Sequence, residues 1–266
     1  MKKIGFIGAG NMGLPLLIGA TKLLGAEQLT FFCADDFSNK RAKETTGVEQ
    51  AESLENLVKT CECVVLAVKP QSFGEVLPVI KANTFEGQMI ISLAPGVTVD
   101  YLSEETGGKT KIVRTMPNTP AMVGEGMTAI CYGSDSFTTE EKQVVRDLFE
   151  SVGKAAELPE RLMDAAVVAS GSSPAYVYMF MEALADGAVK YGIPRAQAYE
   201  MVAQTMIGAG KMLLETGEHP GKLKDNVCSP GGTTIAAVAA LEEGGFRNAV
   251  LKACDACYEK AVSLKK

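Results

Sequence analysis

The 266-residue chain contains a single histidine and no tryptophan. A Ser-His-Asp triad, a Cys-His pair or a multi-histidine metal site would therefore have to be built on His219 alone. Basic residues are also few, since 26 Lys and Arg stand against 32 Asp and Glu and leave a net charge of −6. That balance argues against a nucleic-acid backbone or an anionic membrane surface as a partner. With 47% hydrophobic and 22% charged residues, the composition also excludes intrinsic disorder.

Long uncharged runs without glycine or proline are absent as well, so we expect no membrane span. Lys2 and Lys3 precede an uncharged stretch, but its glycines make a poor signal-peptide core and no Ala-x-Ala cleavage site follows. The seven cysteines are an odd number without a secretion signal, so we expect free thiols in a cytoplasmic protein. Cys254 and Cys257 have metal-ligand spacing, but no second pair or nearby histidine completes four ligands, and we expect no metal.

What the chain has in excess is glycine, with 27 residues, about 10% of the chain against a usual ~7%. Its first half alternates short apolar runs with segments of helix length. Continuous apolar runs suit strands that are buried on both faces of a parallel sheet, and strand–helix alternation is typical of a doubly wound α/β fold. The predicted strands are Lys3–Ile7, Leu29–Cys33, Cys63–Val68, Met89–Leu93, Ile112–Thr115, Met127–Cys131 and Ala155–Glu157.

After about Arg161 the strands disappear and helical periodicity takes over. The segment Ala175–Tyr191 is apolar on nearly all sides, so it must be covered by its own domain or by another chain. We therefore predict an N-terminal Rossmann-like doubly wound sheet, residues 1–160, followed by an all-α domain, residues 161–266. A small helical domain with so many apolar faces indicates an obligate oligomer.

The motif Gly8-Ala-Gly-Asn-Met-Gly13 follows the first predicted strand and opens a helix that runs to about Leu24. In dinucleotide-binding folds the first glycine allows a tight turn, the second lets a pyrophosphate approach the backbone, and the third permits close helix–strand packing. The N-terminus of the helix then offers its N–H groups to the phosphates. In this strand–helix setting the motif favours dinucleotide binding over a simple tight turn.

Two acids, Asp35 and Asp36, end the second predicted strand at the distance where such folds place a ribose-binding acid. A carboxylate there accepts a hydrogen bond from a 2′-hydroxyl and repels a 2′-phosphate, which favours NAD(H). The alternative is that one of the two acids caps the following helix. Asn39, Lys40 and Arg41 could instead surround a 2′-phosphate, so NAD(H) and NADP(H) both stay open.

Three further segments, 67–70, 92–96 and 116–120, lie at the carboxyl ends of predicted strands, where doubly wound sheets bind ligands. A fourth, the polar and glycine-rich segment 226–234, precedes an Ala/Val/Ile helix. Hydroxyls and glycine amides at a helix start suit a substrate carboxylate. The alternative for this last segment is a helix cap, with Ser229 at the N-cap and Pro230 in the first turn.

Taken together, these motifs make the sequence resemble the pyrroline-5-carboxylate reductases, which make proline from 1-pyrroline-5-carboxylate. The resemblance covers essentially the whole chain. It rests on the motifs at Gly8–Gly13, Ala67–Pro70, Met116–Pro120, Ser173–Tyr176, Glu218–Val227 and Ser229–Ile235.

The resemblance implies hydride transfer from NAD(P)H to the C=N carbon of 1-pyrroline-5-carboxylate, giving L-proline. A protonated cyclic imine already carries the positive charge that a carbonyl reductase must induce, so positioning can supply most of the catalysis without a histidine. In the family the α domains interlace into dimers, and five dimers commonly form a decamer. The resemblance also implies that Thr234 is the catalytic residue, bonded to the ring nitrogen of the substrate.

The resemblance implies two groups of site residues, with Asn118 near the nicotinamide and Ser229–Thr234 at the substrate carboxylate. The substrate-binding residues are Asn226, Ser229, Gly231, Gly232, Thr233 and Thr234. The cofactor-binding residues, among which Asp35 comes from its spacing, are Ile7, Gly8, Ala9, Gly10, Asn11, Met12, Gly13, Asp35, Ala67, Val68, Lys69, Pro70, Ala94 and Asn118.

Three positions depart from the family pattern. Ser173 stands where the family commonly has glycine, and Leu54 stands where some members have asparagine. Asp35 stands where members that prefer NADPH often have a serine. These positions bear on the fit of the substrate and on the choice between NADPH and NADH.

Two other functions fit part of the pattern. A β-hydroxyacid dehydrogenase also pairs a Rossmann domain with an α domain, but it needs a catalytic lysine shortly after a glycine-rich turn. Here Gly171 is followed by no lysine until Lys190, which is too far along. A non-catalytic NAD(P)-binding sensor would keep Gly8–Gly13 but has no need for a polar second site at 229–234.

Overall fold

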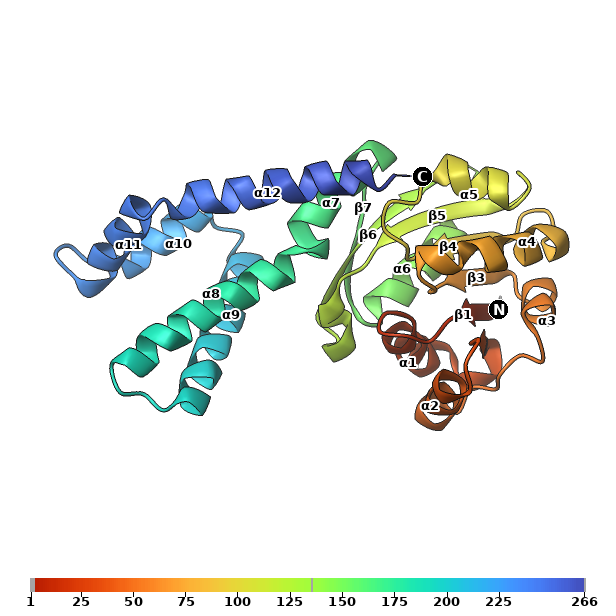
Figure 1. The fold of residues 1–266 in the computed structure, drawn as a ribbon, viewed down its shortest axis with the longest axis horizontal. Coiled ribbons are helices and arrows are strands. Elements are labelled where there is room, and N and C mark those ends of the chain that lie inside the picture. Colours follow the sequence, from red (N-terminus) through yellow and green to blue (C-terminus); the bar gives the residue numbers. More distant parts are fainter. Residues whose placement is uncertain (1–2, 135, 266) are drawn as a thin grey trace. The chain divides into compact units, whose positions relative to one another are not determined.

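The computed structural model describes residues 3–134 and 136–265, which are drawn in Figure 1. These residues form two compact units. Unit 1 comprises the described residues up to Pro174 together with those from Cys257 onward, and unit 2 comprises Ala175–Ala256. All strands of the described residues lie before residue 158, which confirms that strands end before Arg161. A domain boundary at residue 160 stays a prediction.

Unit 1 is built on a seven-stranded sheet in the order β2-β1-β3-β4-β5-β6-β7. The first five strands of the chain are parallel, β6 is antiparallel to β5, and β7 is parallel to β6. The connection between β5 and β6, residues 117–125, is too short for the crossover that a parallel neighbour requires, which explains the reversal. All seven predicted strands are present: β1 Ile4–Ile7, β2 Leu29–Phe32, β3 Cys63–Leu66, β4 Met89–Ser92, β5 Lys111–Met116, β6 Gly126–Tyr132 and β7 Gly153–Glu157.

Apolar side chains cover both faces of the sheet, because successive residues of a strand point to opposite sides. Phe6 belongs to a core with α1, α2 and α6, whereas the next residue, Ile7, belongs to a core with α3, α4, α5 and α7. The sheet is therefore buried on both faces, as the continuous apolar runs predict. The helices of this unit are α1 Gly13–Leu24, α2 Asp36–Thr46, α3 Leu54–Thr60, α4 Phe73–Asn83, α5 Val99–Glu105, α6 Thr139–Glu150 and α7 Met163–Ala166, with short 3₁₀ turns at Ala26–Gln28, Pro70–Ser72, Thr119–Val123 and Glu160–Leu162 and a π-helical turn at Val167–Gly171.

Unit 2 is all-α, and its helices leave much apolar surface exposed. Ala185 and Ala198 are its fully buried hydrophobic residues, whereas Met179 is 71% and Leu214 is 67% exposed. Surface of this kind calls for a covering partner, as the helical pattern predicts. Among the described residues, none of the helices is both long and apolar enough to pass through a bilayer. The remaining helices are α8 Ser173–Lys190, α9 Arg195–Thr216, α10 Pro220–Val227, α11 Thr233–Glu243 and α12 Phe246–Ser263.

A buried ion cluster in unit 1 surrounds Arg114, a charged residue in the middle of β5. Its guanidinium donates to Asp164 Oδ1 at 2.9 Å and lies 3.3 Å from Glu160 Oε1. Arg114 is 3% and Asp164 2% exposed, so both charges lie in the interior. The other carboxylate oxygen of Asp164 is 2.6 Å from Nζ of Lys265, near the C-terminus. Glu160 Oε1 also accepts the N–H of Val99 at 2.8 Å, which ties the start of α5 to the same cluster.

Neither edge strand of the sheet is left as a long, unpaired apolar strand. At one edge, Phe31 of β2 forms a parallel bridge with Gln50, whose neighbour Ala51 donates its N–H to Phe31 O at 2.8 Å. At the other edge, β7 is a five-residue strand with exposed Lys154 and Glu157, and Glu157 pairs with Lys142 at 3.2 Å. Neither edge therefore presents a long apolar strand.

We expect Asp164→Ala to lower the free energy of unfolding by about 3–5 kcal/mol, because it leaves the Arg114 charge buried without its main partner. Urea unfolding at fixed protein concentration measures the change. The matched control is Glu150→Ala, which removes an exposed pair with Arg146 at 3.6 Å and should cost less than about 1 kcal/mol. Equal losses in the two variants would contradict a structural role for the buried cluster.

Candidate functional site

The glycine-rich turn between β1 and α1 is closely packed. Gly8 has a φ of +95°, which favours glycine, and its N–H donates to Phe32 O at 2.8 Å. A Cβ on Gly13 would lie 2.3 Å from the carbonyl oxygen of Gly8 and 2.8 Å from the Cβ of Ala67. These two glycines therefore permit the tight turn and the close helix–strand packing that the motif predicts.

Gly10 has a different environment, because a Cβ built there meets no atom within 4 Å. It faces open space at the start of α1. The N-cap residue of this helix, Met12, makes no side-chain cap, and no acid lies in the first turn. The N–H of Leu14 donates to Gly10 O at 3.0 Å. The N–H groups that precede it and the positive end of the helix dipole are thus available to an anion.

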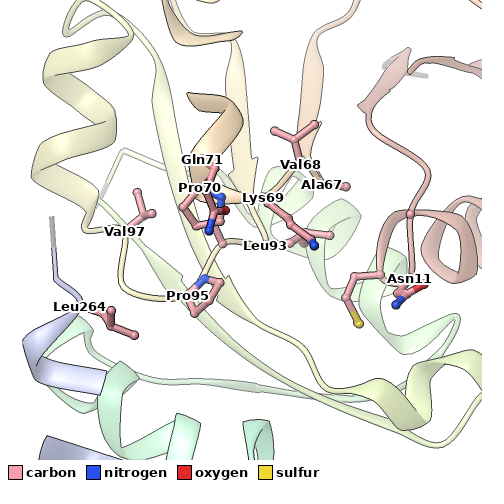
Figure 2. Close-up of a pocket in the computed structure, with 13 residues that line it drawn as sticks. Asn11, Ala67, Val68, Lys69, Pro70, Gln71, Leu93, Pro95, Val97 and Leu264 are labelled. Carbon is pink, nitrogen blue, oxygen red and sulfur yellow. The ribbon is translucent and has the colours of Figure 1, made fainter. Parts of the chain in front are cut away.

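The space in front of Gly10 is a pocket of about 750 Å³ at the carboxyl ends of β1, β3 and β4. We call it the strand-end pocket, and Figure 2 shows its lining side chains. Lys69 is the one charged side chain among the residues that line it. The lining residues are Gly10, Asn11, Met12, Ala67, Val68, Lys69, Pro70, Gln71, Leu93, Ala94, Pro95, Val97 and Leu264.

The pocket brings together residues from three of the predicted motifs. Ile7, Ala9, Gly8 and Gly13 support the turn behind it. Leu93 and Pro95 also line the pocket and belong to the predicted segment 92–96. Sequence reasoning missed Gln71, Val97 and Leu264 as lining residues. The first two adjoin predicted segments, whereas nothing local to Leu264 indicates that this part of the chain returns to the pocket. The predicted cofactor residues that line the pocket are Gly10, Asn11, Met12, Ala67, Val68, Lys69, Pro70 and Ala94.

Asp35 lies between β2 and α2 and is the N-cap of that helix, accepting the N–H of Ser38 at 2.8 Å. The capping alternative is therefore confirmed for Asp35. The bond from Ser38 holds the pKa of the Asp35 carboxyl below its usual value. The side chain is exposed and ionised at neutral pH, so capping leaves its charge available to a ligand.

The three residues that could surround a 2′-phosphate differ in how they are placed. Asn39 is occupied, because its carboxamide accepts the N–H of Cys33 and donates to Cys33 O, both at 3.1 Å. Lys40 lies 3.8 Å from Glu44 on the exposed face of α2. Arg41 is exposed. Only the two cations have side chains that are available at the surface.

Asn118 follows β5, and its buried side chain links two other segments by hydrogen bonds. Its Nδ2 donates to Ser170 O at 3.0 Å, and its Oδ1 accepts the N–H of Met127 at 2.8 Å. Ser170 belongs to the π-helical turn, which precedes Ser173. The hydroxyl of Ser173 donates to Ala169 O at 2.9 Å, so the serine at the family's glycine position folds back onto this turn. The third departing position, Leu54, is the first residue of α3.

The second candidate segment lies in unit 2, in the connection from α10 to α11. The alternative, in which Ser229 caps the next helix with Pro230 in its first turn, is wrong, because α11 begins at Thr233 with Gly232 as N-cap. The glycines insert one more turn, in which Gly231 has a φ of +70°. Gly232 has no side chain to cap the helix, and its N–H donates to Ser229 O at 3.0 Å. The first N–H groups of α11 itself therefore face no side-chain cap and suit an anion.

The other predicted residues of this segment differ in exposure. Thr234 is half-buried in the first turn of α11, whereas Asn226 and Thr233 are exposed. His219 is exposed, and as the N-cap of α10 its Nδ1 accepts the N–H of Gly221 at 3.0 Å.

Comparison with known proteins gives one consistent family. Residues 160–264 match the family model "Pyrroline-5-carboxylate reductase dimerisation", and residues 3–96 match "NADP oxidoreductase coenzyme F420-dependent". The pyrroline-5-carboxylate reductase of Escherichia coli K12 is 45% identical over 100% of this chain and 99% of its own length. A Coxiella burnetii pyrroline-5-carboxylate reductase superposes with a TM-score of 0.93 at 32% identity, covering 100% of this chain and 99% of that one. The Plasmodium falciparum enzyme, solved with NADP bound, gives 0.85 at 34% identity, covering 100% and 98%.

We expect Gly13→Ala to lower the free energy of unfolding by about 1–3 kcal/mol, because the new methyl group meets backbone on one side and Ala67 on the other. Gly10→Ala is the matched control in the same turn and should change stability by less than about 0.5 kcal/mol. Urea unfolding without added ligand measures both. A larger loss for Gly10→Ala than for Gly13→Ala would show that the turn is packed differently.

Proposed function

The chain belongs to the pyrroline-5-carboxylate reductase family, and from that membership we propose which of its residues carry out the family's reaction. The protein is an oxidoreductase of proline biosynthesis that reduces the C=N bond of 1-pyrroline-5-carboxylate to L-proline with NAD(P)H. Relatives at full coverage support this reaction over that of a β-hydroxyacid dehydrogenase or a non-catalytic sensor. The observation that carries the residue assignment is the open space at Gly10 beside an uncapped helix start.

The strand-end pocket fits a nicotinamide dinucleotide. The open approach to the Gly10 backbone and the free N–H groups at the start of α1 suit a pyrophosphate. The walls formed by Ala67–Pro70 and by Ala94 are largely uncharged, which suits a nicotinamide ring and its ribose. Residues Ile7–Gly13, Ala67–Pro70 and Ala94 would hold the cofactor, with Asp35 on the ribose of its adenosine half.

Asn118 takes a different part in this arrangement. The resemblance to the family implies a position near the nicotinamide, but both ends of the Asn118 carboxamide are hydrogen-bonded within the protein. We propose that it shapes the nicotinamide side of the site by holding the π-helical turn against the end of β5.

The substrate carboxylate would bind at the start of α11. The backbone N–H groups of Ser229, Gly231, Thr233 and Thr234 and the hydroxyls of Ser229 and Thr233 are the donors, with Asn226 beside them. Pro230 has no N–H, and the N–H of Gly232 donates to Ser229 O at 3.0 Å. Thr234 would hydrogen-bond the ring nitrogen and so fix the orientation of the C=N bond. The uncapped, glycine-rich helix start supports this assignment.

Positioning supplies most of the catalysis in this scheme. When bound, the reduced nicotinamide supplies the hydride, and the protonated imine is already an acceptor. The residues of the chain therefore need to hold the two reacting carbons at about 3–3.5 Å and to exclude water, rather than to donate a proton from a strong acid. This agrees with Lys69 as the one charged side chain that lines the pocket.

Homo-oligomerisation is supported by the dimerisation-domain match and by the exposed apolar residues of unit 2. We propose that residues 161–266 form this α domain, after a dinucleotide-binding domain of residues 1–160, and that five dimers assemble into a decamer. A cytoplasmic location is also proposed. Free thiols at Cys33, Cys61, Cys131, Cys228, Cys254 and Cys257 support it, because such thiols are typical of a reducing compartment.

We expect Thr234→Ala to lower kcat by about 10- to 100-fold, because the hydrogen bond that orients the imine is lost. The Kd for NADH should stay unchanged, since Thr234 acts on the substrate. NADH oxidation at 340 nm with 1-pyrroline-5-carboxylate measures turnover, and fluorescence titration measures binding. Thr234→Ser is the control, which keeps the hydroxyl and should retain most of the activity. Wild-type turnover in Thr234→Ala would exclude its catalytic role.

We expect Asp35→Ser to shift the ratio of kcat/KM for NADPH to that for NADH upward by about five- to tenfold, because a charge that repels the 2′-phosphate is removed. Serine is also a good N-cap, so α2 should be retained. Because the pKa of Asp35 is lowered, its charge is complete at neutral pH and above, and the ratio for the wild type should not change between about pH 7 and 9. Asp36→Ser is the matched control. An equal shift in both variants would mean that general surface charge, rather than Asp35, sets the preference.

A further inference from the structure

The C-terminal end of the chain forms one wall of the strand-end pocket. Leu264 lines the pocket together with Pro95 and Val97, and it is 53% exposed, so its side chain is available to a ligand. The residues from Cys257 onward belong to unit 1, the unit that contains the pocket. The last turn of the chain is ordered by hydrogen bonds from the N–H of Leu264 to Ala261 O and from the N–H of Lys265 to Val262 O.

The loop after β4 is shaped to accept this segment. Gly96 has a φ of +73°, and a Cβ built on it would lie 2.8 Å from the carbonyl oxygen of Leu264. The two backbones therefore approach as closely as glycine allows, and any larger residue at Gly96 would press against the end of the chain. This close contact holds Leu264 next to the pocket.

An ion pair of Lys265 links the C-terminal residues to the buried carboxylate of Asp164. Its Nζ lies 2.6 Å from Asp164 Oδ2, and Asp164 is itself held by Arg114 through its other oxygen at 2.9 Å. In this ion pair the side chain of Lys265 is 42% exposed, whereas that of Asp164 is 2% exposed. The end of the chain is thus attached to a rigid, buried group.

The position of Leu264 indicates which part of a cofactor it would meet. Figure 2 shows Asn11 at one end of the pocket and Leu264 with Val97 at the other, with Lys69 and Pro70 between them. The phosphates belong at the Gly10 end, and the adenosine belongs toward Asp35 after β2. Because β3 and β4 lie on the other side of β1 from β2, the wall at Leu264 lies on the nicotinamide side.

We propose that Leu264 and Lys265 position the nicotinamide half of the cofactor, with Leu264 as its apolar wall and Lys265 as the attachment of that wall to Asp164. The proposal rests on the assignment of the strand-end pocket to NAD(P)H. Leu264 contacts the cofactor directly, whereas Lys265 acts through it as a positioning residue.

Leu264→Ala tests the wall. The Kd for NADH should rise about five- to tenfold, the effect of removing partly buried apolar contact. The inhibition constant of ADP, which lacks the nicotinamide half, should stay at the wild-type value. An unchanged Kd for NADH, or an equal loss of ADP binding, would overturn the proposal.

Lys265→Met tests the attachment. The KM for NADH should rise about two- to fivefold, on the scale of a partly exposed ion pair, while the KM for 1-pyrroline-5-carboxylate stays unchanged. Lys265→Arg should restore wild-type behaviour because it keeps the charge. Lys260→Met, which removes an exposed lysine from the same helix, is the matched control. A loss of equal size in Lys260→Met, or no rescue by arginine, would contradict the role of Lys265.

Gly10→Val separates this proposal from the cofactor assignment on which it depends. A valine there fills the space next to the helix start, so NADH and ADP should both lose most of their affinity. If Gly10→Val binds both like the wild type, the cofactor assignment itself fails. If Gly10→Val loses binding but Leu264→Ala and Lys265→Met bind NADH normally, only the role of the C-terminal segment fails.

Discussion

The buried charge of Arg114 is the constraint on which much of unit 1 depends. A guanidinium in the interior is tolerated only when carboxylates satisfy it, and here Asp164 and Glu160 do so from the segment that follows the sheet. Asp164 in turn holds Lys265 at the end of the chain. One strand, the connection into the helical region and the C-terminus are thereby joined at a single point. Because Asp164 is shared by Arg114 and Lys265, these segments specify one arrangement together.

The sequence predicts the sheet well, because burial on both faces requires continuous apolar runs and glycine motifs have local geometric causes. It does not predict that Arg114 is satisfied by Asp164 or that Leu264 reaches the pocket, because these contacts depend on where distant segments return. The alternative in which Ser229 caps α11 fails for another reason. Ser229 and Pro230 satisfy the local rule for a helix start, but the two glycines that follow insert another turn before Thr233. The preference of Ser229 and Pro230 for a helix start is therefore overridden by the glycine turn that follows them.

The two glycines that flank the start of α1 show how one motif combines two physical roles. Gly13 is required by the protein itself, because its neighbours leave no room for a methyl group. Gly10 has room, so its lack of a side chain serves whatever approaches from outside. The whole site shows the same two roles. Asn118 and Asp164 stabilise the surrounding backbone through hydrogen bonds and ion pairs, whereas the lining of the pocket is mostly uncharged. A reaction that needs alignment more than proton donation is suited to such a surface.

The two edge strands of the sheet limit how copies of the chain can associate. An unpaired strand is a template for extending a sheet from one molecule into the next. Gln50 occupies that position beside β2, and the short β7 carries charges of both signs. Extension of the sheet across subunits is thus discouraged at both ends, and the exposed apolar helices of unit 2 are left as the surfaces on which copies of the chain can meet.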